Sequence, residues 1–139
     1  MTRAGLLALA CLLSTLACQT SDNSNPPPTT PDPGVTENFS GTVNVGGSAI
    51  NPFTVALSGG LLTVTLTSAG PPANVVLGMS IGMWDGTTCT PVTGGSTTTA
   101  AGSSPQLSGS VDAGKYCVSV YDPGNLGAAV SFAVRVTHY

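Results

Sequence analysis

Apolar and polar residues alternate in run after run from residue 38 to the C-terminus, and no segment there keeps a 3.6-residue period. The clearest runs place apolar side chains at Leu62, Val64 and Leu66, and again at Val130, Phe132, Val134 and Val136. Because successive side chains of a strand point to opposite faces, such runs predict half-buried β-strands. We therefore predict an all-β domain, an antiparallel two-sheet β-sandwich that is jelly-roll-like, with seven to nine strands and one disulfide.

Turn-forming residues suggest how consecutive strands pair. The runs 53–57 and 62–66 flank Ser58-Gly59-Gly60 and predict a hairpin. The runs 116–121 and 130–137 flank a segment rich in Asp, Pro, Gly and Asn and predict a second antiparallel hairpin.

Two further segments are harder to assign. Residues 75–81 are almost continuously apolar, which indicates either a strand buried on both faces or a crowded edge of the core. Residues 94–104 are Gly, Ser and Thr without a period, so we predict a loop there, with at most a weak strand at 97–101.

The segment 39–45 also alternates. It places Phe39, Val43 and Val45 on one side of a predicted strand, and we expect that side to face inward.

The first eighteen residues have the pattern of an export signal. Arg3 provides a cationic start, residues 4–17 are small and apolar, and Cys18 follows. This run is shorter than the roughly 20 residues that span a bilayer, yet it suits the apolar region of a signal peptide. We assign residues 1–17 to a signal peptide that is removed on export.

Thr15-Leu16-Ala17-Cys18 resembles the bacterial lipoprotein signal, in which small residues precede a cysteine that is lipidated and becomes the mature N-terminus. The family usually has Leu three residues before that cysteine, where this chain has Thr15. The resemblance implies lipidation at Cys18 and a membrane partner through the lipid. Because Gln19 replaces the Asp that retains many such lipoproteins at the inner membrane, it also implies an outer-membrane lipoprotein of the bacterial cell envelope, periplasmic or surface-facing. Plain secretion after cleavage at Ala17 is the alternative, and a cytoplasmic protein with an apolar N-terminus is a third.

A disordered tether is predicted after the lipidated cysteine. Residues 18–37 are rich in Pro, Ser and Thr and hold almost nothing to bury. In a polyproline conformation of about 3.1 Å per residue, they would hold a domain some 50 to 60 Å from its anchor. The predicted β-sandwich domain then comprises residues 38–139.

The domain resembles the bacterial pre-peptidase C-terminal domain and its relatives, which are small β-sandwich modules of secreted proteins. The resemblance rests on the segments 53–55, 59–66, 80–85, 113–120 and 132–136, and it covers nearly all of 38–139. It implies the sandwich fold and an accessory role. No protease domain is attached, and no positions match the acidic cluster that some collagen-binding relatives use for calcium, so no binding residue is carried over.

The cysteines predict one disulfide. With Cys11 removed in the signal and Cys18 lipidated, Cys89 and Cys117 remain, and an even pair in an oxidising compartment is best read as a bridge. Closing a loop of about 28 residues stabilises the fold by roughly 3 to 4 kcal/mol in the chain-entropy model. Cys117 shares its parity with Ser119 and Tyr121, so we expect the bridge on the outer surface, pinning residues 84–92 across the sheet.

The scarcity of charge excludes several functions. The chain has 3 Lys+Arg, 6 Asp+Glu and one His, and only 6% of its residues are charged, against about a quarter in an average domain. These few Lys and Arg residues cannot form a basic surface that binds phosphate groups. Nucleic acid is therefore not a predicted partner. A catalytic triad would have to use His138, next to the C-terminus, and no Gly-x-Ser-x-Gly elbow occurs. We predict no enzyme activity.

Four residues are candidate ligand contacts: Trp84, Tyr121, Asp85 and Asp122. Exposed aromatic rings stack on sugars, although a lone Trp in a small domain is more often buried. Turn carboxylates offer oxygen ligands to Ca²⁺, although Asp in a turn more often bonds its own backbone, and no calcium-loop spacing is present. We predict no cofactor, with Ca²⁺ as the alternative.

The sequence therefore predicts a non-catalytic cell-envelope lipoprotein that displays an interaction or structural module to envelope proteins. The alternative is a surface module that binds carbohydrate, with or without the help of Ca²⁺, and has polysaccharide as its partner.

Overall fold

The structure, a computed structural model, describes residues 33–139, and the signal segment, Cys18 and all of the tether before Pro33 lie outside the described residues. Residues 33–139 form strands and no helix. The strands are β1 (Val35–Val43), β2 (Ser48–Val55), β3 (Gly60–Gly70), β4 (Val76–Trp84), β5 (Cys89–Ala100), β6 (Leu107–Val111), β7 (Gly114–Tyr121) and β8 (Val130–His138). Strand β1 begins three residues before the predicted start of the domain, because residues 35–37, which the sequence analysis gave to the tether, pair with β8.

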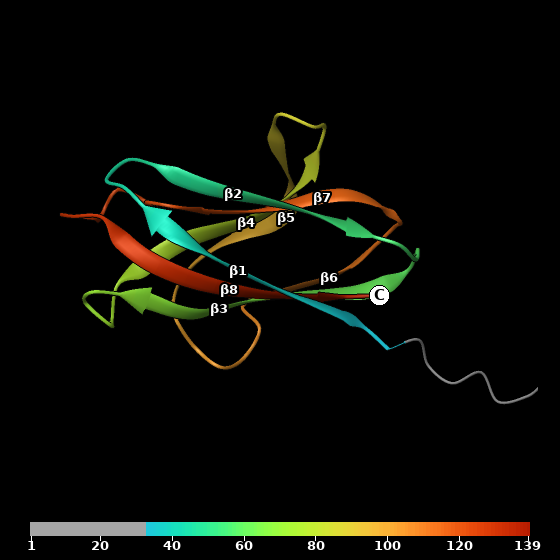
Figure 1. The fold of residues 1–139 in the computed structure, drawn as a ribbon, viewed down its shortest axis with the longest axis horizontal. Helices are drawn as coiled ribbons and strands as arrows, with labels where there is room; N and C mark the ends of the chain where they lie inside the picture. Colours follow the sequence, from blue (N-terminus) through green and yellow to red (C-terminus); the bar gives the residue numbers. More distant parts are fainter. Residues whose placement is uncertain (1–32) are drawn as a thin grey trace, which may run out of the picture. The chain divides into compact units, whose positions relative to one another are not determined.

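The eight strands form two four-stranded antiparallel sheets packed face to face (Figure 1). One sheet has the order β1-β8-β3-β6 and the other β2-β7-β4-β5. Strand β1 pairs with β8, β2 with β7, β3 with β6 and β4 with β5, so the chain folds as one long two-stranded ribbon that wraps around a common core. The predicted jelly-roll-like sandwich with one disulfide is confirmed.

Both predicted hairpins are wrong. Strands β2 and β3 lie in different sheets, and so do β7 and β8. The turns between them do reverse the chain, but they carry it across the core from one sheet to the other. Alternation shows that one face of a strand is buried, but it does not show in which sheet. A strand buries its apolar face equally well in either of the two sheets. The one pair of consecutive strands that are neighbours in a sheet is β4 and β5.

The predicted loop at 94–104 is wrong for residues 94–96, while the weak strand expected at 97–101 is confirmed as far as Ala100, because β5 continues to that residue. As an edge strand, β5 pairs on one side with β4 and needs no large apolar residues, so its β-branched threonines suffice. The ladder between them shifts register between Ser80 and Gly82 of β4, and the tip of this hairpin stands out from the sandwich in Figure 1. Val45 lies beyond the end of β1 and is 57% exposed, which corrects its expected inward position.

The core lies between the two sheets and is built from the inward residues of every run that the sequence pointed to. Strand β8 alternates strictly between buried and more exposed residues. Strand β4 differs, because six consecutive residues, 77–82, are buried. The continuous apolar run is therefore a central strand covered on both faces, one of the two interpretations left open by the sequence.

Candidate functional site

The outer face of the β2-β7-β4-β5 sheet brings the two aromatic candidates onto one surface. In the β4–β7 ladder, Gly78 is opposite Tyr121 and Gly82 is opposite Cys117. Alternate residues share a face, so Trp84 lies on the same side of the sheet as Tyr121. Six residues of β4 separate Trp84 from the position opposite Tyr121, which is about 20 Å along the strand.

The disulfide crosses this face between the two rings. Cys89 of β5 is bonded to Cys117 of β7, with a Cα–Cα distance of 5.8 Å, and the bridge passes over Gly82 of β4. A Cβ atom on Gly82 would stand 3.0 Å from Sγ of Cys89 and 2.6 Å from the carbonyl oxygen of Thr90. The predicted bridge and its outward side are confirmed, and the missing side chain of Gly82 is what leaves room for it.

Tyr121 covers the other end of β4. Its ring lies over Gly78, where an added Cβ would overlap the ring atoms, and its side chain is half-buried. Between this ring and the disulfide, Ser80 and Ser119 are only 3% and 9% exposed although they point away from the core. The middle of the outer face is thus closed to solvent, and the two candidate aromatic side chains, Trp84 and Tyr121, lie at its two ends.

Trp84 borders a shallow depression at its end of the face. The depression has a volume of about 270 Å³ and is lined by Trp84, Pro52, Phe53, Thr54 and Lys115. Trp84 itself is half-buried, and Lys115 is exposed. An indole face, a proline, a hydroxyl and an ammonium group make a surface that can stack on a flat apolar ring and donate hydrogen bonds to its substituents.

Asp85 serves its own turn. Its Oδ1 accepts hydrogen bonds from the backbone N–H of Thr88 at 2.7 Å and from the N–H and hydroxyl of Thr87 at 2.8 and 3.0 Å. Hydrogen bonds that stabilise the charged form, above all the one from Thr88, lower the pKa of the carboxyl below its ordinary value. This is the turn-forming role that was weighed against Ca²⁺ binding.

Asp122 joins two turns that are far apart in the sequence. Its Oδ2 accepts from the N–H of Gly46 at 2.8 Å, and its Oδ1 accepts from the N–H groups of Gly124, Asn125 and Leu126. The bond from Gly46 is the largest cause of a lowered pKa for this carboxyl. Within residues 33–139 no group of three or more His, Cys, Asp or Glu side chains is placed to hold a metal ion.

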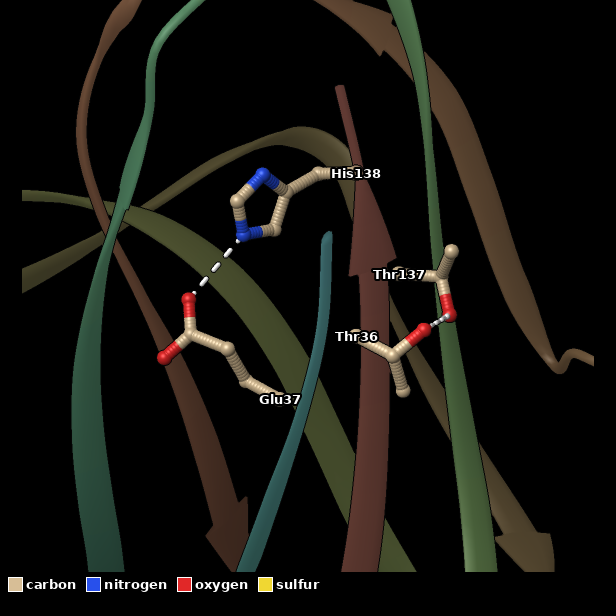
Figure 2. A network of polar contacts seen from close by, with 4 residues as sticks. All are labelled: Thr36, Glu37, Thr137 and His138. Atoms are coloured by element: carbon tan, nitrogen blue, oxygen red, sulfur yellow. Dashed lines mark hydrogen bonds and ion pairs between the residues drawn. The ribbon is translucent and has the colours of Figure 1, made fainter. Parts of the chain in front are cut away.

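Sequence reasoning missed the pair formed by His138 and Glu37 (Figure 2). The histidine is 2% exposed, and its Nε2 lies 3.0 Å from Oε1 of Glu37 on the neighbouring strand β1. An ionised carboxylate only accepts hydrogen bonds, so Nε2 carries the hydrogen. Its Nδ1 is buried without a hydrogen-bond partner in the part of the chain that the structure describes.

The surroundings of His138 explain why this residue is buried. Its ring stacks on Phe53 with 5.5 Å between centroids, and Phe53 stacks in turn on Tyr116 at 6.0 Å. On the opposite side of the same two strands, the hydroxyls of Thr36 and Thr137 meet at 3.2 Å (Figure 2). The signal available in the sequence was the parity of His138, which continues the buried series of β8. The histidine is part of the core and contacts no open site.

No helix that could cross a membrane occurs among the residues the structure describes.

Comparison with known proteins gives a likeness among solved structures. No family model matches the chain, and no curated protein matches its sequence. Among solved structures, the chain is similar to PliG of Aeromonas hydrophila, a periplasmic lysozyme inhibitor of g-type lysozyme, with a TM-score of 0.48 and 18% sequence identity. The match covers 75% of this chain and 86% of that chain.

Proposed function

We propose that the chain is a non-catalytic lipoprotein of the bacterial cell envelope, anchored through Cys18, that displays its β-sandwich as an interaction module. The observation that carries this proposal is that the polar side chains make contacts within the fold, while two aromatic side chains lie at the surface. Asp85 and Asp122 hold turns, Glu37 and His138 hold each other, and the half-buried rings of Trp84 and Tyr121 remain at the two ends of one outer face. These four polar groups serve the fold, and the two aromatic rings are partly open to solvent.

Export and anchoring are supported by two independent features. The Cys89–Cys117 bridge belongs to an oxidising compartment, as is normal for exported proteins. The lipoprotein-like signal before Cys18 would direct export and lipidation. The Pro-rich segment after it would hold the domain at a distance from an outer membrane. The eight-stranded sandwich is compatible with the resemblance to pre-peptidase C-terminal domains and supports an accessory role.

A second function, carbohydrate binding, is favoured by the Trp84 depression. Two aromatic rings on one face, with the hydroxyl of Thr54 and the ammonium group of Lys115 beside one of them, provide the stacking and polar contacts that a glycan needs. At about 20 Å apart, the rings would contact separate sugars of an extended polysaccharide.

Anchoring is tested by expressing the full chain and its Cys18→Ser variant in a Gram-negative host fed with an alkyne fatty acid. We expect label and membrane association in the parent chain and loss of both in the variant. Label retained in the variant, or a parent chain that is unlabelled and soluble, overturns the anchored function in favour of plain secretion.

Glycan binding is tested by thermal unfolding of the full chain with a panel of polysaccharides and with Ca²⁺, because a ligand selective for the folded state raises the midpoint. A shift that is lost in Trp84→Ala and kept in Ser108→Ala, a change at an exposed position of the other sheet, supports the carbohydrate alternative. No shift with any glycan rejects that alternative and leaves protein partners.

A further inference from the structure

The four edge strands of the sandwich are not equally protected against pairing with another strand. Free sheet edges are templates for association, and proteins blunt them with proline, short strands, bulges or lysine. Strand β2 contains Pro52, β5 contains Pro91 and a register shift, and β6 is only five residues long. Strand β1 has nine residues, no proline, no lysine and no irregularity in its ladder with β8.

We propose that β1 is an interface through which two copies of this chain pair, edge to edge and antiparallel, to make one continuous eight-stranded sheet. Among the described residues nothing pairs with the second edge of β1. A two-fold axis at Phe39, the middle residue of the strand, engages all nine residues of both copies. Such an arrangement is an isologous contact and closes at a dimer.

The side chains of β1 are complementary to themselves in this register. On the outer face, Asn38 lies opposite Ser40 of the second copy and Thr36 lies opposite Thr42, so every facing pair can exchange hydrogen bonds. On the inner face, the half-buried ring of Phe39 meets its own counterpart at the two-fold axis. A slip by one residue would bring inner residues opposite outer ones, which excludes odd registers.

Charge supports the same register. Glu37 is the one charged residue of β1, and an inward-pointing charge can itself act against edge pairing. Here its carboxylate is already held by His138 at 3.0 Å, and the two-fold axis at Phe39 sets it opposite Gly41 of the second copy. The two Glu37 residues are then four positions apart along the strand, about 13 Å, so they do not face each other. A shift that centres the pair on Glu37 would bring these like charges together.

The first test places lysines on the interface. Asn38→Lys/Ser40→Lys sets ammonium groups directly opposite each other, and Ser108→Lys/Ser110→Lys adds the same charge to β6, the other edge of the same sheet. Both pairs point to solvent, so melting temperatures check that each variant folds. The molar mass of the full chain is measured by sedimentation equilibrium in a density-matched detergent.

We expect a dimer for the parent chain and for the β6 variant. For the β1 variant we expect association to weaken at least tenfold, meaning a dissociation constant at least ten times larger. Mixing the β1 lysine variant with Asn38→Asp/Ser40→Asp should restore the dimer by charge complementation. A parent chain that stays monomeric at every concentration overturns the proposal. So does a dimer that the β6 variant disrupts and the β1 variant does not.

The register is tested by cross-linking. An equimolar mixture of Asn38→Cys and Ser40→Cys chains should form an interchain disulfide, because directly opposite Cα atoms lie about 4.5 to 5.5 Å apart. A mixture of Thr36→Cys and Ser40→Cys chains has the same added thiols in diagonal positions, too far apart to bridge. Equal cross-linking in the two mixtures contradicts the register centred on Phe39.

Discussion

The two sheets have equal numbers of strands and share one core, but the contact that ties strands together within each sheet lies on a different face. The β2-β7-β4-β5 sheet carries its tie on the solvent face, where the Cys89–Cys117 bridge spans β4. The β1-β8-β3-β6 sheet carries its tie on the core side, where His138 meets Glu37. The first sheet has a central strand buried on both faces. On the outer face of the second sheet most residues are exposed or half-buried, and Thr65 is buried. A covalent tie tolerates solvent, and a polar pair gains strength where water is partly excluded, as it is here, with the side chain of His138 2% and that of Glu37 32% exposed.

The largest effect should come from removing the covalent tie. Cys89→Ala/Cys117→Ala frees the closed loop in the unfolded chain and should lower the free energy of unfolding by about 3 to 4 kcal/mol. Urea denaturation of the full chain measures this loss. If the sheet is instead secured by its packing, the double variant will unfold at nearly the parent urea concentration, and the contrast between the two ties fails.

The second sheet should respond to the loss of its buried histidine. His138→Ala removes a ring stacked on Phe53 and leaves the carboxylate of Glu37 without its partner, so we expect a loss of about 2 to 3 kcal/mol. Glu37→Gln is the matched control, because its amide oxygen still accepts a hydrogen bond, and it should cost about 1 kcal/mol or less. Equal losses in the two variants would show that charge, and not burial, holds this edge.

The sequence predicted each strand better than it predicted the partners of the strands. The alternation at Leu62, Val64 and Leu66 identified residues that are all fully buried. The same pattern suggested hairpins because neighbouring runs were separated by turn residues. In this fold a turn between consecutive strands moves the chain from one sheet to the other, and nothing in the local sequence of a turn distinguishes that crossing from a hairpin.

The candidate site shows the same limit. Parity placed Cys117 and Tyr121 on one outward face, which the ladder with β4 confirms. The register that sets Gly82 beneath the disulfide and Gly78 beneath Tyr121 depends on pairing between distant strands, so it was not visible in the sequence. The contact between His138 and Glu37 was missed for the same reason, since Glu37 reaches the histidine only through the β1–β8 ladder.

The aromatic cover of β4 can be tested separately from the disulfide. Gly78→Ala puts a Cβ where the Tyr121 ring lies, so the ring must swing outward, and we expect a loss of about 1 to 2 kcal/mol. The same glycine substitution in a Tyr121→Ala background should cost much less, because the clash is gone. A double-mutant cycle in urea measures this coupling, and additive losses would mean that the ring does not cover the strand.

Acid should weaken the turns of both sheets. The pKa values of Asp85 and Asp122 are lowered by hydrogen bonds to their carboxylates, so their contribution to stability is complete above their ordinary pKa and is lost as the pH falls through the lowered values. We expect a flat melting temperature between about pH 5 and 7 and a decline below about pH 4. Asp122→Asn should flatten that decline more than Asp85→Asn, since Asp122 joins two distant turns. The opposite ranking would make the bond from Gly46 unimportant.

The smallest effect is expected on the outer face of the second sheet. Thr36→Val removes the 3.2 Å contact between the hydroxyls of Thr36 and Thr137, which lies across the strands from the Glu37–His138 pair. Both sides of that contact can bond water instead, and valine favours a strand as much as threonine does, so the free energy of unfolding should change by less than about 0.5 kcal/mol. Urea denaturation beside Glu37→Gln measures the difference between the two faces of β1. A loss larger than that of Glu37→Gln would show that the solvent face ties this sheet as well, and the contrast between the two sheets would then fail.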